Sequence, residues 1–206
     1  MRHLGLLWMI AACHEAGTPA IDAPDGPGAN AGLFVTWGAR PRLPGPLTAS
    51  ITLSQVTFGI DRFEVQSDAD GGTSRARYPL TWSAGATPVP ETFPDAPSGL
   101  YSRVAITLGG YYDNAYEIEG TWLDRGKTKP FRIVDRGTLK TSFELSATLA
   151  AGGAATIGID IELADAVGGL DFHRLDDDDG ELELLTGDPQ LVGFRKRLAD
   201  AFRIAD

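Results

Sequence analysis

The sequence predicts a mainly β protein, an antiparallel β-sandwich that carries one amphipathic helix at its C-terminal end. Two observations support this prediction. From Leu33 onward, apolar residues recur at every second position in a series of short segments separated by turn-forming residues, as in half-buried strands. Near the C-terminus, the apolar period changes to three and four residues, which is the period of an α-helix.

The first half of the predicted sandwich contains four strands, at residues 33–37, 50–53, 56–66 and 77–82. Within 56–66 the apolar phase shifts by one residue at Phe63, which predicts a β-bulge near Asp61 and Arg62. Asp, Ser and Gly dominate residues 67–72, which we therefore interpret as a turn. Four prolines then mark a loop with at most a short edge strand: Pro88, Pro90, Pro94 and Pro97.

The second half continues the alternation, with strands predicted at residues 100–108, 116–122, 131–133, 139–149, 157–163 and 182–185. A helix of about four turns follows. Asp188 is a suitable N-cap and Pro189 a suitable first helical residue. The apolar face of this predicted helix comprises Leu191, Phe194, Leu198, Ala201 and Phe202.

Composition excludes several classes of function. The chain has 206 residues, with 18 Lys and Arg against 28 Asp and Glu, a formal net charge of −10. So acidic a chain is a poor partner for nucleic acid, because phosphate binding needs clustered basic side chains. Its single cysteine, Cys13, allows no internal disulfide bond and no cysteine-based zinc site.

The N-terminal residues have the pattern of a signal peptide. Arg2 supplies a positive charge, residues 4–10 are mostly apolar, and Ala11 and Ala12 are the small residues that a signal peptidase requires. The apolar run is much shorter than the roughly 20 residues that span a bilayer. We therefore expect a signal peptide at residues 1–12.

The sequence Ile10-Ala11-Ala12-Cys13 resembles the lipobox of bacterial lipoproteins. The resemblance implies cleavage before Cys13, a covalent lipid on its sulfur, and acylation, as with palmitate, of the new amino group. More than one acyl chain anchors a protein stably to a membrane without a basic patch. In the enterobacterial sorting pattern an Asp after the Cys retains the protein in the inner membrane, so His14 favours the outer membrane.

The remaining chain divides into a tether and one domain. Pro, Gly, Ala and Asp dominate residues 13–32, which we interpret as the lipidated cysteine and a flexible linker. Residues 33–206 resemble the β-sandwich domains of uncharacterised bacterial lipoproteins. Residues 94–103 also resemble the entry to a strand in immunoglobulin-like and transthyretin-like secreted domains, which implies a fold and no activity.

Three aromatic residues are candidate ligand contacts. Tyr111 and Tyr112 are adjacent in a loop beside Asp113 and Asn114, and Trp122 lies in the predicted strand that follows. Exposed tyrosines stack on sugars or contact partner proteins, which makes a carbohydrate-binding module the alternative function. The competing interpretation is that these aromatic residues cover the core at the end of a strand.

Acidic residues provide two further hypotheses. Asp176, Asp177, Asp178 and Asp179 are hard oxygen ligands that suit calcium, although their spacing does not match an EF-hand, and acidic turns are common in β proteins. Glu117 and Glu119 fall on one face of a strand, as paired carboxylates do in glycoside hydrolases, but solvent-facing strands have the same pattern.

No nucleophile-elbow motif accompanies His173, the only histidine of the predicted domain. The sequence therefore predicts a non-enzymatic envelope protein. Its expected partners are the membrane, through its lipid, and an envelope protein or a glycan, with no cofactor beyond the lipid and the calcium alternative. The hydrolase is the weaker alternative.

Overall fold

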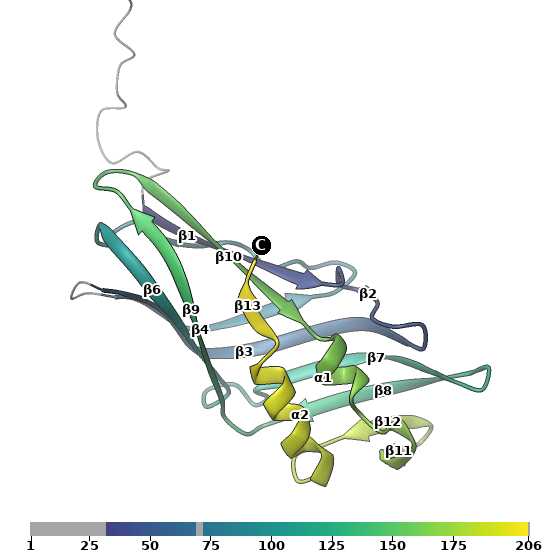
Figure 1. Cartoon of the computed structure of the whole chain (residues 1–206). Coiled ribbons are helices and arrows are strands. Elements are labelled where there is room, and N and C mark those ends of the chain that lie inside the picture. Colours follow the sequence, from purple (N-terminus) through teal and green to yellow (C-terminus); the bar gives the residue numbers. More distant parts are fainter. Residues whose placement is uncertain (1–31, 69–71, 206) are drawn as a thin grey trace, which may run out of the picture.

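The structure is a computed structural model that describes residues 32–68 and 72–205, and it confirms the mainly β prediction (Figure 1). Two sheets form a sandwich-like arrangement. The smaller sheet has the strand order β13-β10-β1-β5 and the larger has the order β11-β12-β8-β7-β3-β6-β9, with β2 and β4 also paired to β3. The predicted signal peptide, Cys13 and nearly all of the linker lie outside the described residues.

The strands are β1 (Gly32–Arg40), β2 (Gly45–Pro46), β3 (Ile51–Ser67), β4 (Thr73–Trp82), β5 (Glu91–Phe93), β6 (Gly99–Leu108), β7 (Tyr116–Asp124), β8 (Lys127–Asp135), β9 (Leu139–Leu149), β10 (Ala154–Glu162), β11 (Asp176–Asp178), β12 (Glu181–Leu184) and β13 (Phe202–Ile204). The helices are α1 (Ala164–Gly168), the 3₁₀ helix η1 (Phe172–Arg174) and α2 (Pro189–Ala199). Among the described residues, none of the helices has the length and hydrophobicity of a transmembrane span.

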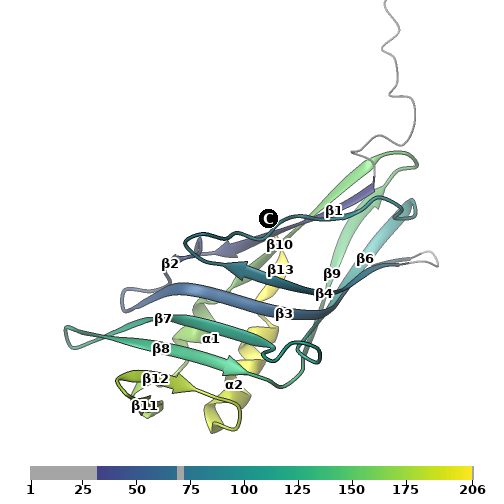
Figure 2. The ribbon, with the colours of Figure 1, turned by 180° about the vertical axis from the view of Figure 1, so that it is seen from behind.

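The central element is β3, a single strand of 17 residues where the sequence predicted two segments. Its first half pairs with β7 and its second half with β6, while β4 pairs along its other side. Figure 2 shows β3, β7 and β8 side by side in the larger sheet. The register shifts between Ile60 and Arg62, so the predicted bulge is confirmed.

The prediction of purely antiparallel pairing is wrong for two pairs of strands. β1 pairs in parallel with β10, and β12 pairs in parallel with β8. An alternating apolar pattern specifies which side of a strand is buried, but it carries no information about the direction of the neighbouring strand.

Aromatic side chains from both sheets meet in the core around Phe63 of β3, which is fully buried. Its ring lies 5.3 Å from that of Trp37 in β1 and 6.2 Å from that of Phe93 in β5, measured between centroids. Tyr78 of β4 contacts it edge-on at 6.4 Å. Since Trp37 and Phe93 belong to the smaller sheet, Phe63 joins the two layers of the sandwich.

The C-terminal helix α2 begins where the sequence predicts. The Asp188 side chain accepts a 2.7 Å hydrogen bond from the backbone N–H of Gln190, and Pro189 follows the cap. The predicted extension of the helix to Phe202 is wrong, because α2 ends at Ala199 and Phe202 begins β13. There Phe202 pairs with Ile161 of β10 and packs 5.5 Å from Phe58, so strand pairing and core burial replace the last helical turn.

α2 covers the inner side of the larger sheet at β7 and β8 (Figure 1). Phe194 packs 5.7 Å from Tyr116, and next to it Arg195 forms two hydrogen bonds to the carboxylate of Asp135, at 2.7 and 2.5 Å. Asp135 is fully buried and also accepts hydrogen bonds from the N–H of Gly137 and the hydroxyl of Thr186. This charged contact therefore fixes the helix to the end of β8.

The Asp135 contact predicts a dependence of stability on pH. Burial alone would raise the pKa of Asp135, but the hydrogen bonds from Arg195 and Gly137 outweigh it and hold the pKa below its ordinary value. A carboxylate with a lowered pKa stabilises the folded state above the unfolded-state pKa of about 3.9, and this stabilisation disappears as the pH falls through the folded-state pKa.

We expect Asp135→Asn to unfold at a lower temperature than the wild type at pH 7, and the difference to shrink as the pH falls below about 4. Thermal unfolding followed by circular dichroism between pH 7 and pH 2 measures this. A difference that stays constant over that range would show that the ionised carboxylate does not stabilise the fold.

Candidate functional site

The loop that carries Tyr111 and Tyr112 is closely attached to the larger sheet. Gly109 and Gly110 turn the chain after β6 with φ values of 86° and 82°, which favour glycine. Gly59 of β3 donates a hydrogen bond to the carbonyl of Ala115 and accepts one from Gly109, both at 2.9 Å. These contacts hold both ends of the loop against the same strand.

A close approach at Gly59 fixes the loop further. A side chain on Gly59 would lie 2.8 Å from Cβ of Tyr112 and 2.7 Å from the carbonyl oxygen of Asn114, which no real side chain tolerates. Tyr112 therefore packs directly on the backbone of β3, and the loop has little room to move.

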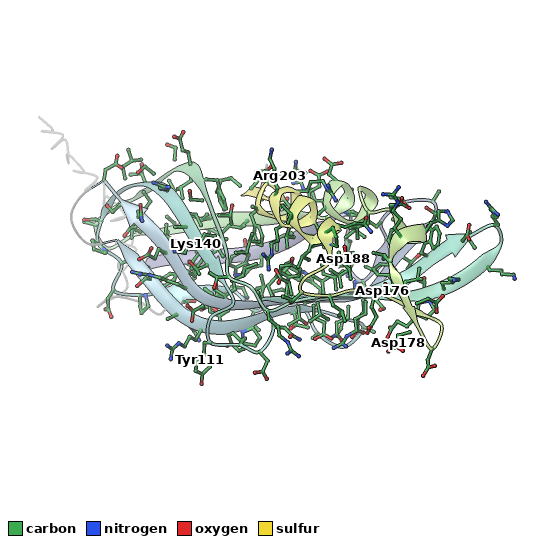
Figure 3. The ribbon with its side chains drawn as sticks, turned by 90° about the horizontal axis from the view of Figure 1, so that it is seen from below. Tyr111, Lys140, Asp176, Asp178, Asp188 and Arg203 are labelled. Atoms are coloured by element: carbon green, nitrogen blue, oxygen red, sulfur yellow. The ribbon has the colours of Figure 1, made fainter. Side chains whose placement is uncertain are left out.

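Tyr111 projects outward from this loop. Its side chain is 62% exposed and points away from the body, on the side of the larger sheet opposite α2 (Figure 3). The ring stands nearly perpendicular to that of Tyr112, at an interplanar angle of 87° and a centroid distance of 5.5 Å. The guanidinium of Arg77 lies 4.4 Å from the Tyr111 ring centroid, which is cation–π distance.

Arg77 lies in β4, level with the bulged stretch of β3. The β3–β4 register is the same on both sides of this point, and Asp61 and Arg77 lie between the pairs Ile60↔Tyr78 and Arg62↔Ala76. Arg77 adopts a positive φ of 67°, a conformation that costs a non-glycine residue about 1 kcal/mol or more. Its Nε lies 3.7 Å from the Asp61 carboxylate. Arg77 thus lies between the carboxylate of Asp61 and the ring of Tyr111.

The structure does not bring Trp122 to this surface. Trp122 stacks on Phe172 of η1 with a centroid distance of 5.2 Å and an interplanar angle of 16°, and the His173 ring contacts it edge-on at 4.8 Å. Trp122 thus packs against the core, and no side chain of an acidic residue in the described ranges pairs with the His173 ring beside it.

The four aspartates form the start of a β-hairpin. Asp176–Asp178 is β11, paired antiparallel with β12, and Asp179 and Gly180 turn the chain with φ values of 49° and 91°. Asp177 points to the side of the strand opposite Asp176 and Asp178, so the four carboxylates do not converge on one point. Lys129 lies 2.9 Å from Asp177, and its hydrogen bond and charge lower the pKa of Asp177. In the part of the chain that the structure describes, no three acidic, His or Cys side chains are grouped to hold a metal.

Glu117 and Glu119 lie on the outer face of β7, as predicted for alternate residues of one strand. Glu117 accepts a hydrogen bond from Arg132 Nε at 2.7 Å and one from the amide of Asn114 at 3.2 Å. The hydrogen bond to Glu117 raises the pKa of Arg132. The Glu117 carboxylate is thus engaged by Arg132. The geometry favours a structural ion pair between these two residues over a catalytic acid–base pair formed by Glu117 and Glu119.

A pocket that the sequence interpretation missed adjoins this ion pair. Its volume is about 340 Å³, and it lies on the outer face of β8 between the tyrosine loop and the end of β12. The lining residues are Asn114, Arg132, Val134, Arg136, Glu183, Leu185 and Thr186. The sequence signals were Val134 and Leu185, apolar residues at outward positions, and such positions are common on any sheet.

Comparisons with protein-family models, with curated proteins and with solved structures give no match to the chain. The candidate site therefore stands on its own geometry. It has two parts: the exposed Tyr111 and, beyond Asn114, the polar pocket. We call Tyr111 together with the residues that line the pocket the outer-face site.

Proposed function

We propose that the protein is a lipid-anchored component of a bacterial cell envelope that binds a partner or has a structural role, and that it is not an enzyme. The observation that carries this proposal is the position of Cys13 directly after Ile10-Ala11-Ala12. His14 supports the outer membrane as the destination. The proposed attachment is through lipid, since the chain is too acidic to bind anionic lipid by charge.

The ion pairs of the described residues support a non-enzymatic role. Each of the three buried acidic residues is paired with an arginine: Glu91 with Arg75, Asp135 with Arg195 and Asp160 with Arg40. Glu117 is paired with Arg132 in the same way. A general base needs a carboxylate free to accept a proton from a substrate, so the hydrolase alternative has less support than binding.

Changing Cys13 tests the anchor. In the host bacterium we expect the wild-type chain to incorporate an alkyne-labelled palmitate and to sediment with membranes, because two or more acyl chains anchor stably. Cys13→Ser is expected to lose the label completely. Gel fluorescence of the labelled chain and fractionation of the envelope measure the two properties.

A second substitution tests the destination. The wild type is expected in the outer-membrane fraction of a density gradient, and His14→Asp in the inner-membrane fraction. A Cys13→Ser chain that keeps its label, or a wild-type chain whose intact mass still includes residues 1–12 without lipid, would contradict the proposal. A wild-type chain in the inner membrane would contradict only the destination.

A further inference from the structure

The outer-face site combines two kinds of surface within a short span of chain. Tyr111 and Asn114 are three residues apart, so their Cα atoms are at most about 11 Å from one another. Tyr111 presents a flat apolar ring, whereas Asn114 forms part of the wall of the pocket over β8. Because the Tyr111 ring lies against Arg77 of β4 and the pocket lies over β8, a ligand that contacts both must be an extended chain of several units.

The pocket offers hydrogen-bond donors and acceptors around an apolar floor. Val134 and Leu185 supply the apolar surface. Asn114, Arg132 and Arg136 bring donors, and Glu183 and the hydroxyl of Thr186 bring acceptors. This combination is typical of sites for small polar ligands. The ligand rests on the apolar surface, and a few polar groups at defined positions fix its orientation.

The charges around the pocket are close to balanced. Arg132 is hydrogen-bonded to Glu117 and is also within electrostatic reach of Glu119 and Glu183. Arg136 makes no ion pair with any described residue and faces the same pocket. Arg132, Arg136 and Glu183 line the pocket, and Glu117 beside it is paired with Arg132. Two cationic side chains are thus offset by two anionic ones, which disfavours a strongly charged ligand of either sign.

From these observations we infer that the outer-face site binds a neutral oligosaccharide, with one sugar ring stacked on the face of Tyr111 away from Arg77 and another sugar of the same chain in the pocket over Val134. Sugars present an apolar ring face and many hydroxyl groups, which matches an aromatic platform beside paired donors and acceptors. The fixed loop favours this binding, because a side chain that is already ordered loses little entropy when a ligand binds. The inference deepens the binding role proposed above and rests on it.

The probe is a glycan array that holds neutral hexose and N-acetylhexosamine oligomers beside their uronate and sulfated counterparts, incubated with the purified full chain. Calorimetric titration with the best-bound neutral oligomer then gives the dissociation constant. We expect Tyr111→Ala to weaken binding more than about tenfold, as for a central aromatic contact. Glu183→Ala, which removes an acceptor of the pocket, is expected to weaken binding severalfold.

Val89→Ala is the matched control, because Val89 is 77% exposed and lies outside the outer-face site. It is expected to leave the dissociation constant unchanged. An array without neutral ligands, a preference for charged glycans, or affinity unchanged in both Tyr111→Ala and Glu183→Ala would overturn the inference. Palmitate labelling of Cys13 reports the proposed anchor separately, so failure of one proposal is distinguishable from failure of the other.

Discussion

Replacing Asp135 by alanine is expected to lower the free energy of unfolding by about 3–5 kcal/mol, because the change removes one partner of a buried ion pair and leaves Arg195 without its carboxylate. The backbone N–H of Gly137 and the hydroxyl of Thr186 lose an acceptor at the same time. Urea unfolding monitored by circular dichroism measures the loss. We expect the helix α2 to detach before the sheets unfold.

Two further variants test whether the loss of stability arises from the burial of the Asp135–Arg195 ion pair and not from the loss of any charged contact. Arg203→Ala breaks an ion pair with Glu162 in which both side chains are about half exposed, and it is expected to cost less than about 1 kcal/mol. The double variant Asp135→Ala/Arg195→Ala is expected to cost less than the two single changes added together, since it leaves no unpaired charge. If Asp135→Ala costs no more than Arg203→Ala, the contact does not hold α2 in place.

Phe63→Ala is expected to destabilise the fold by about 3–5 kcal/mol, because it opens a cavity where the two sheets meet. Trp37 and Phe93 would lose the ring against which they pack, so the smaller sheet is expected to loosen relative to the larger one. Denaturant unfolding gives the free energy, and hydrogen exchange of the β1 and β5 amides reports the loosening.

Phe63→Leu serves as the graded comparison and is expected to cost about 1–2 kcal/mol, because it keeps most of the apolar volume. Val89→Ala, at an exposed position, is expected to change stability by less than about 0.5 kcal/mol. An equal loss in Phe63→Ala and Phe63→Leu would mean that the cavity collapses and that Phe63 does not join the sheets.

Most strands of this fold were predictable because each has a buried side and an exposed side. Residues 139–149 match β9 from end to end, and the phase shift at Phe63 predicted the bulge that the structure has. The N-cap at Asp188 was predictable for a different reason, since a short acceptor before Pro189 is a local signal.

Features that depend on distant partners were not predictable. The parallel pairing of β1 with β10 and the strand at Phe202 depend on which sheet edge is available for pairing in the folded molecule. No local sequence pattern encodes which edge that is. The same reason applies to the candidate site. Tyr111 was recognisable as an aromatic residue in a glycine-rich loop, but the pocket forms only because β12 lies beside β8.

The parallel pairing of β1 with β10 also bears on when the chain is able to fold. Arg40 and Asp160, which pair across these strands, are 120 residues apart in sequence. The first strand therefore has no partner on that side until most of the polypeptide has been made, and contacts of such long range form slowly. During synthesis the smaller sheet therefore stays incomplete at β1 until β10 has been made.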